Sequence, residues 1–434
     1  MKRILIAEGV PLQNRGEEAI VRGIADFLFE NEKVEIAVMD FVDNSTYFND
    51  IKVFPITLLY PFHRPMRTQV MNLPDLSFFD KIRKYYNLFS FLWGDYGSAN
   101  QLLRKNNLGY KELREYIEGC DYVFFGHDGA WGISSVPVFI VCRRYFKAKT
   151  GILGSGFNPI TKGLRGLIER VAYRKAISLA HFAFFRETKA FQYMKSLSLN
   201  NPLVKITPDP AFGMKYESLD LVDKFFSEGY PIIRASKDAN KLIVVVTVCE
   251  NSVVFKQSFL QAENREEKTN IHNRLIAYLL DKLIVRYQAF IVFLPHTKDE
   301  GRGNDVLISS EVLDLMQYKS EAVVITDDLD ARFLKAIIKW ADFLLGERTH
   351  SIIGALSVAT PFGMLTNIHD HRSYSIIGEV GDCKEMLLNI EKDRQVLIDD
   401  ISILINNRGE LHHKLIHKSN VLKQRLIQVR DEIL

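Results

Sequence analysis

The chain has 434 residues, of which 47% are hydrophobic, and its 56 lysines and arginines nearly balance 53 aspartates and glutamates. That length predicts two to three domains, with enough apolar residues for one or two full cores. A net charge of +3 argues against nucleic acid as the main partner, because non-specific phosphate binding usually needs a larger and more clustered basic excess.

Strands and helices alternate through the first half of the chain. Short apolar runs that end in glycine or polar loops predict buried strands, and the amphipathic segments between them predict helices. The predicted strands cover 3–7, 33–40, 121–126, 150–156, 181–187 and 204–212, and the predicted helices cover 17–31, 112–119, 136–148, 165–180 and 187–197. Residues 43–100 are aromatic-rich and irregular, which indicates an insertion with one or two helices. The alternation predicts α/β structure with a mainly parallel sheet.

The pattern restarts after a transition at 213–240. KLIVVVTV is a continuous β-branched run, which is typical of strands covered on both faces in parallel sheets. The predicted strands of this half cover 241–248, 289–297, 322–328, 342–350 and, last, 360–366, and the predicted helices cover 270–287, 330–341 and 350–359. Residues from about 384 onward are charged and helical, which is typical of a solvated helix face.

Two successive α/β halves predict two Rossmann-like domains facing across a cleft. The expected N-terminal domain covers 1–213, the C-terminal domain covers 240–383, and a helical segment covers 384–434. Ligands of open parallel sheets bind at the carboxyl ends of the strands. Polar clusters do follow the predicted strands, in the order NRGEEA, GHDGAWG, GSGFNP, RE, PDPAF, PHTKDE and ERTH.

The segment GERTHS places Arg348 and His350 where a core strand turns into a helix. A helix N-terminus favours anions, an arginine fork suits carboxylate or phosphate, and a histidine titrates near neutral pH. Together they predict a site where a small anion undergoes proton transfer. The structural alternative is an ion pair of Arg348 with Asp342 or Asp328 and a capping role for His350.

Two further cationic residues end predicted strands. Arg186 could bring a second guanidinium to the cleft, or it could form an inter-domain salt bridge. His296 could contact a phosphate or an acceptor, or it could pair with Asp299 or Glu300 in its loop. Both alternatives stay open at this point.

The loops of the first half offer candidates for a sugar hydroxyl. Asn14 permits a turn and Glu17 suits a helix start, and glycines such as Gly126 permit close backbone approach. Asp209 lies between two prolines, where a rigid turn is the plainer explanation. No dinucleotide-binding, P-loop, GxSxG, HExxH or EF-hand pattern is present, so the sequence indicates neither a cofactor nor a metal.

In this order, the clusters resemble the polysaccharide pyruvyl transferase family. The matching pieces are NRGEEAI, GHDGAWG, GSGFNP, FRE, PDPAF, LPHT and ERTHSIIGALSVATPF, spread over about residues 5–380. The resemblance implies an enzyme that transfers the pyruvyl group of phosphoenolpyruvate to a sugar of a polysaccharide or its precursor, forming a cyclic ketal. It also implies a GT-B-like fold, with the acceptor on the N-terminal domain and the donor on the C-terminal domain.

The resemblance assigns roles to residues. Arg186, Arg348, His350 and His296 fall where the family binds the donor, with His350 as the preferred general acid and Arg348 assisting. Acceptor or loop candidates are Asn14, Glu17, Gly126, Asp128, Asn158 and Arg372. GHDG replaces a commoner glycine-rich loop, Arg372 stands where a lysine is frequent, and an arginine often found near VVVTVCEN is missing. These departures leave the acceptor open.

Two rival functions remain at this stage. One is a GT-B glycosyltransferase that uses a nucleotide sugar, with Glu347 on the ribose hydroxyls. The other is a non-catalytic carbohydrate-binding protein of the same fold, whose cationic residues would be paired internally.

The expected location is the cytoplasm, and a position at the inner face of the membrane is left open. The four cysteines lie far apart, which suits buried thiols in a reducing compartment. No signal peptide or transmembrane run is evident. Residues 78–93 mix basic and aromatic residues, which leaves peripheral membrane contact open beside packing on their own domain. The expected partners are phosphoenolpyruvate and a saccharide acceptor, free or lipid-linked; the sequence leaves the oligomeric state open.

Overall fold

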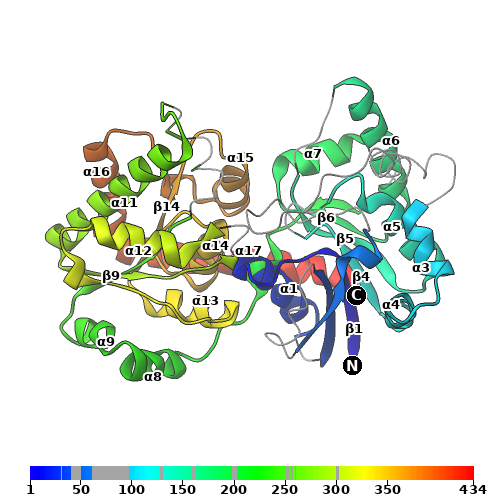
Figure 1. Ribbon diagram of the computed structural model, residues 1–434, viewed down its shortest axis with the longest axis horizontal. Coiled ribbons are helices and arrows are strands. Elements are labelled where there is room, and N and C mark those ends of the chain that lie inside the picture. Colours follow the sequence, from blue (N-terminus) through cyan, green and yellow to red (C-terminus); the bar gives the residue numbers. More distant parts are fainter. Residues whose placement is uncertain are drawn as a thin grey trace. The chain divides into compact units, whose positions relative to one another are not determined.

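The computed structural model shows two compact α/β units (Figure 1). The structure describes residues 1–30, 32–40, 50–60, 97–127, 131–157, 162–197, 203–249, 255, 258–259, 261–299 and 303–434. Unit 1 comprises residues 1–12, 24–210 and 425–434, and unit 2 comprises residues 13–23 and 211–424. The chain passes from one unit to the other between residues 12 and 13, within helix α1 (Arg15–Leu28), between residues 210 and 211, and within helix α17 (Arg408–Ile433).

Unit 1 is built on a seven-stranded parallel sheet of order β3-β2-β1-β4-β5-β6-β7. Apolar side chains fill its central strands, and the four residues of β4 are all buried. The strands are β1 (Lys2–Gly9), β2 (Val34–Asp40), β3 (Ile51–Pro55), β4 (Tyr122–Phe125), β5 (Lys149–Ser155), β6 (Ala183–Phe185) and β7 (Val204–Ile206), and the helices are α3 (Gln101–Arg104), α4 (Leu108–Glu118), α5 (Ser135–Tyr145), α6 (Gly163–Leu179) and α7 (Thr188–Leu197).

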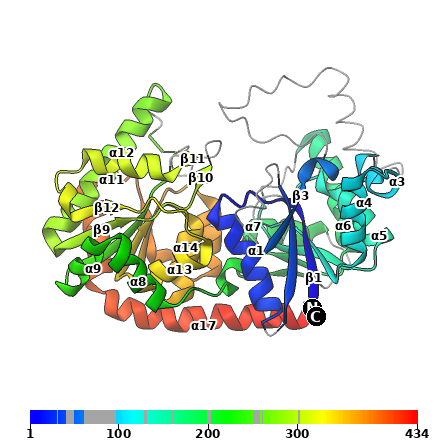
Figure 2. The same ribbon diagram turned by 60° about the horizontal axis from the view of Figure 1, so that its bottom comes forward.

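Helices α5, α6 and α7 cover one face of this sheet (Figures 1 and 2). Each connects a strand to its next neighbour in the same direction along the sheet. Because such crossovers are right-handed, all three helices fall on the same face. Helix α5 contacts α6, and α6 contacts α7.

Unit 2 is built on a six-stranded parallel sheet of order β12-β9-β8-β13-β14-β15. Strand β8 is buried at every residue, as expected for a central strand. The strands are β8 (Leu242–Thr247), β9 (Ala289–Phe293), β12 (Ala322–Val324), β13 (Phe343–Gly346), β14 (Phe362–Thr366) and β15 (Leu387–Asn389), beside a separate small pair of β10 (Lys298–Asp299) and β11 (Gly303–Asn304).

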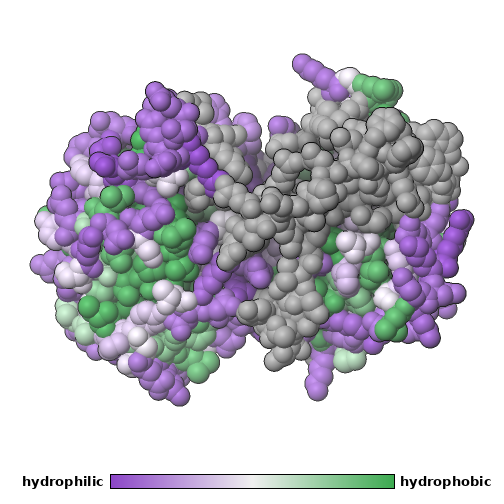
Figure 3. All heavy atoms as spheres, in the orientation of Figure 1, coloured by the Kyte–Doolittle hydropathy of each residue, from purple (hydrophilic) through white to green (hydrophobic). Residues whose placement is uncertain are grey.

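The helices of unit 2 surround this sheet. They are α8 (Leu219–Gly229), α9 (Pro231–Asp238), α11 (Arg265–Tyr287), α12 (Asp305–Leu315), α13 (Ala331–Trp340), α14 (Thr349–Val358), α15 (His371–Ser373), a π-helical segment at Tyr374–Val380, α16 (Arg394–Asn406) and most of α17. In the view of Figure 3, exposed hydrophobic residues gather around α12, whose Leu307 is 59% exposed.

The predicted α/β class with two Rossmann-like sheets is confirmed. The strand at 360–366 is not the last one, because β15 adds to the sheet inside the segment expected to be wholly helical. The transition at 213–240 contains α8 and α9. Most of the predicted insertion at 43–100, including the aromatic segment at 78–93, lies outside the described residues.

The units divide the chain differently from the sequence-based domains. Residues 13–23, which the strand–loop–helix pattern attaches to the first domain, belong to unit 2, and α16 and most of α17 belong to the same unit. Within the part of the chain that the structure describes, no helix combines the length and apolarity needed to cross a membrane.

Candidate functional site

The ERTH segment connects the end of strand β13 to the first turn of helix α14. Gly346 ends the strand, and a Cβ there would lie 2.4 Å from the hydroxyl oxygen of Thr247, so the close approach of β8 requires glycine. Arg348 is the N-cap residue of α14, and His350 lies in its first turn. The predicted turn from strand to helix is therefore present, and His350 lines a pocket of unit 2.

The loop NRGEE reaches the same pocket from the start of α1. Asn14 forms an isolated antiparallel bridge with Thr297, and the amide of Arg15 donates to the carbonyl of His296 at 2.9 Å. A Cβ on Gly16 would lie 2.3 Å from Nδ1 of His350. Only glycine therefore lets the start of α1 approach this ring so closely.

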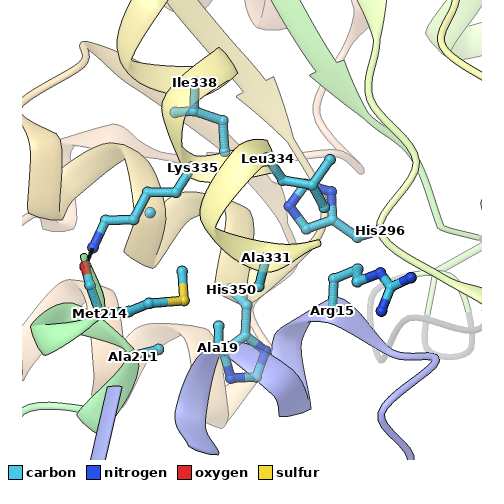
Figure 4. A pocket seen from close by; sticks show the side chains of 11 residues that line it. Arg15, Ala19, Ala211, Met214, His296, Ala331, Leu334, Lys335, Ile338 and His350 are labelled. Carbon is cyan, nitrogen blue, oxygen red and sulfur yellow. Dashed lines mark hydrogen bonds between the residues drawn. The ribbon is translucent and has the colours of Figure 1, made fainter. Parts of the chain in front are cut away.

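The pocket combines basic side chains with an apolar wall (Figure 4). Arg15, His296, Lys335 and His350 supply the basic groups, and none of the described lining residues is acidic. The apolar part consists of Ala19, Ala211, Met214, Ala331, Leu334, Ile338 and Gly354. Every lining residue belongs to unit 2. Such a cavity suits a small anion that also carries an apolar group.

Ion-pair and hydrogen-bond partners fix two of the basic side chains. Arg15 pairs with Glu18 at 3.1 Å and with Asp328 at 2.5 Å. Lys335 is 3% exposed, and its ammonium group donates to the carbonyl of Met214 (Figure 4). Burial raises the pKa of Glu18, although its contacts with Arg22 and Arg15 oppose that rise.

His296 is held as a neutral imidazole. Its Nδ1 lies 2.9 Å from the carbonyl oxygen of Leu294, which can only accept, so Nδ1 carries the proton and Nε2 keeps a lone pair. Burial lowers the pKa of His296 to about 4, and the nearby charges of Arg348, His350 and Arg15 act in the same direction. The carboxylate pairing considered for this residue is absent within the described residues, where the ring bonds to a backbone carbonyl instead.

The low pKa of His296 predicts a pH-dependent stability. The unfolded chain binds a proton near pH 6.5 that the folded protein resists down to about pH 4. Stability should therefore be highest above pH 6.5 and fall by up to ~3 kcal/mol as the pH drops to about 4. Urea unfolding at several pH values measures this loss, and His296→Gln should show a smaller one. An equal loss in both proteins would contradict the assignment.

Asp305 joins the turn after β9 to Arg348. Its Oδ2 accepts from the amides of His296 and Thr297 at 3.0 and 3.1 Å and from Nε of Arg348 at 3.1 Å, while Oδ1 accepts from Nη2 of Arg348 at 2.5 Å. Burial alone would lower the pKa of Arg348. The negative charge and hydrogen bonds of Asp305 outweigh this effect, so the pKa of Arg348 is raised. The structural alternative, an Arg348–Asp ion pair, is present, but the partner is Asp305 at the start of α12 and not Asp342 or Asp328.

Arg186 lies in unit 1 and forms an ion pair with Asp209. Both side chains are 0% exposed. The alternative of a salt bridge between domains therefore does not describe this pair, since both partners belong to the same unit. Asp209 serves as more than a rigid turn between prolines.

Two acceptor candidates of the first half lie in different units. Gly126 in unit 1 has a φ of +82°, and its amide donates to the buried carboxylate of Glu8. Glu17 in unit 2 is 7% exposed. Burial lowers the pKa of Arg372, and the charge of Glu17 opposes this, which places Arg372 within electrostatic reach of that carboxylate. Asp128 and Asn158 lie outside the described residues.

Glu347 is not available to a ligand in this arrangement. It is 3% exposed, and its two carboxylate oxygens lie 2.8 Å from the amide of Cys249 and 2.7 Å from Nε2 of His272. A residue that holds ribose hydroxyls needs an accessible carboxylate. This weakens the case for a nucleotide-sugar site built on Glu347.

Sequence reasoning missed three residues. Lys335 carried a signal, because it falls on the apolar stripe of DARFLKAIIKWA, four residues after Ala331 and three before Ile338. Arg15 lies in the NRGEE segment, of which only Asn14 and Glu17 were predicted to be site residues. Asp305 follows no motif. Among the described residues, no group of three or more metal-ligating side chains is close enough together to hold a metal ion.

Solved structures with the same fold share little sequence with this chain. The Anabaena protein HepE in complex with UDP-glucose is 11% identical, with a TM-score of 0.53 over all of this chain and 98% of that one. The N-terminal domain of Candida albicans trehalose-6-phosphate phosphatase is 11% identical, with a TM-score of 0.53 over 100% and 96% of the two chains. The α,α-trehalose 6-phosphate synthase of Burkholderia multivorans is 11% identical, with a TM-score of 0.51 over 99% and 97%. These likenesses support the GT-B-like fold alone.

Sequence comparison is more specific than this likeness of fold. No curated protein matches the chain significantly. The family model for polysaccharide pyruvyl transferase matches residues 14–369, a range that begins at the NRGEE loop and includes His296, Lys335 and the ERTH turn. With that match across most of the sequence, the chain belongs to the polysaccharide pyruvyl transferase family.

Proposed function

We propose that the pocket of unit 2 binds phosphoenolpyruvate and that the protein transfers its pyruvyl group to a saccharide as a cyclic ketal. The observation that carries this proposal is the lining, whose described residues include the cations Arg15 and Lys335 and the histidines His296 and His350, but no acidic side chain, beside an apolar wall. Phosphoenolpyruvate has a carboxylate and a phosphate for the basic groups and a methylene group for the apolar wall. Membership of the family supports the same reading.

The proposed reaction needs one proton on carbon and one on phosphate. His350 donates a proton to the methylene carbon, which becomes a methyl group and leaves an oxocarbenium-like centre. One sugar hydroxyl attacks that centre, the bond to the phosphate oxygen breaks, and a second hydroxyl closes the ketal. The two hydroxyl protons balance the methyl group and the departing hydrogen phosphate. Lys335 and Arg15 stabilise the charge that develops on the phosphate.

His296 has a different role from His350 in this scheme. A neutral ring with a lone pair on Nε2 cannot attract the donor by charge, but it can accept a hydrogen bond from an incoming hydroxyl. His350, in the first turn of α14, is the proton donor of the proposed mechanism. Arg348 supports this turn through its pair with Asp305.

Donor binding by calorimetry tests the proposal, with Lys335→Met compared against wild type. Loss of one charge-assisted contact should weaken phosphoenolpyruvate binding by roughly 10- to 100-fold. Lys237→Met is the matched control, because Lys237 of unit 2 also donates to a backbone carbonyl, that of Trp340, but does not line the pocket. It should bind the donor like wild type, and His350→Gln should bind it while losing turnover.

The other functions are outcomes of the same experiment. Binding of UDP- or GDP-sugars without phosphoenolpyruvate binding would overturn the proposal in favour of a glycosyltransferase. Donor binding that Lys335→Met and Lys237→Met weaken equally would place the donor elsewhere. Binding of a saccharide alone, with no turnover of either donor, would indicate a carbohydrate-binding protein of this fold.

A further inference from the structure

Basic residues are concentrated in one segment of unit 1. Residues 131–197 contain twelve lysines and arginines and two acidic residues, although the whole chain has a net charge of only +3. Of the two acidic residues, Glu169 is 4% exposed and Glu187 is half-buried. Exposed charge on the described part of this segment is therefore almost entirely positive.

Helix α6 adds an exposed apolar stripe to this charge. Leu164, Leu167 and Val171 are 73%, 55% and 42% exposed. Their spacing of three and four residues places them on one side of the helix. Single exposed hydrophobic residues are common on protein surfaces, but three on one helix side form a continuous apolar strip.

The strip is flanked by cations. Arg170 and Arg174 are exposed beside the strip, and Lys162, the exposed N-cap residue of α6, adds a third cation at the start of the helix. We call these three residues with Leu164, Leu167 and Val171 the α6 face. Helices α5 and α7 cover the same side of the sheet, and they carry the exposed basic residues Arg144, Lys189 and Lys195.

We propose that the α6 face binds an anionic lipid surface, with its leucines in the headgroup region and its arginines on lipid phosphates. Basic residues beside a membrane gain energy from anionic headgroups, and an adjacent apolar strip gains energy by entering the interface. Nucleic acid would match the charge but would leave the leucines exposed. The proposal goes beyond the transfer reaction, and it would bring the enzyme to acceptors carried on lipid.

Vesicle sedimentation of the full-length protein tests this surface. The probes are vesicles of phosphatidylcholine alone and of phosphatidylcholine mixed with phosphatidylglycerol. Wild type should bind only the anionic vesicles. Arg170→Glu/Arg174→Glu should bind them at least ~10-fold more weakly, because each basic residue near the surface contributes about 1 kcal/mol. Leu167→Glu should also lose most binding.

Matched variants separate this surface from general effects. Leu307→Glu changes a leucine of similar exposure in unit 2, 59% against 55%, and Lys224→Glu/Lys319→Glu makes the same change of charge there. Both should bind vesicles like wild type. Equal loss in the control variants would overturn the proposal, as would wild-type protein that stays in solution. Binding to single-stranded DNA that the arginine variant loses and Leu167→Glu keeps would also overturn it.

Discussion

Asp305→Asn is expected to lower the kcat/KM of pyruvyl transfer by about 100-fold while the protein remains folded. The carboxylate of Asp305 accepts hydrogen bonds from two backbone amides, those of His296 and Thr297, and from two nitrogens of Arg348. An asparagine has one acceptor oxygen, and its amide group would face the guanidinium of Arg348. The turn and the arginine would therefore lose their common anchor, and both histidines of the pocket would shift relative to each other.

The expected split between kinetic constants identifies a positioning role. Asp305 does not line the pocket, so the variant should lose mainly kcat, with a smaller rise in KM for the donor. The Nε–H signal of Arg348 in a nitrogen-15 NMR spectrum, assigned through Arg348→Lys, reports the contact without any substrate. It should move on Asp305→Asn even if the donor proves to be a different anion, which separates this prediction from the proposed reaction.

Asp281→Asn is the control for Asp305→Asn. Asp281 on α11 is also a largely buried carboxylate of unit 2, and it accepts from the backbone amides of Gln317 and Tyr318 at 3.0 to 3.1 Å. Asp281 and the two residues whose amides it accepts from, Gln317 and Tyr318, do not line the pocket. Both variants should lose comparable stability, but only Asp305→Asn should lose turnover. Parallel losses of stability and activity in the two variants would show that Asp305 only supports the fold.

The sequence predicted the secondary-structure elements better than it predicted which side chains contact one another. Apolar, β-branched runs such as LIVVVT, and short apolar runs such as FLLG, are typical of buried strands in a parallel sheet, so their places were predicted from the pattern. The position of His350 followed in turn, because polar residues after such strands lie at the carboxyl edge of the sheet. These local rules succeed where a single element decides the outcome.

The sequence could not predict which residues share a pocket. Asp305 and Arg348 are 43 positions apart, and their pairing depends on the tertiary arrangement that brings the first residue of α12 to the N-cap of α14. The assignment of residues 13–23 to unit 2 is a tertiary effect of the same kind, because contacts such as the bridge between Asn14 and Thr297 join residues far apart in the sequence. Hydrophobic periodicity indicates which side of a helix or strand is buried, but it does not indicate which other element packs against that side.

Arg186→Met is expected to destabilise unit 1 by roughly 3–5 kcal/mol. Arg186 and Asp209 are both fully buried, so removal of the arginine leaves an uncompensated carboxylate in the core. Urea unfolding measures the loss. The double variant Arg186→Met/Asp209→Leu removes both charges and should recover most of the stability, because an apolar pair of similar size replaces a buried ion pair at little cost.

The double variant also decides what Arg186 does. Resemblance to the family assigned this arginine to the donor, whereas its burial beside Asp209 assigns it to the core of unit 1. A protein with restored stability and wild-type affinity for phosphoenolpyruvate would make the ion pair purely structural. Restored stability with donor affinity reduced at least ~10-fold would mean that Arg186 also contacts the donor, since loss of a charged contact costs about 1.5–3 kcal/mol. We expect the first result, because the basic groups that line the pocket of His296 and His350 belong to unit 2 and Arg186 has no exposed surface.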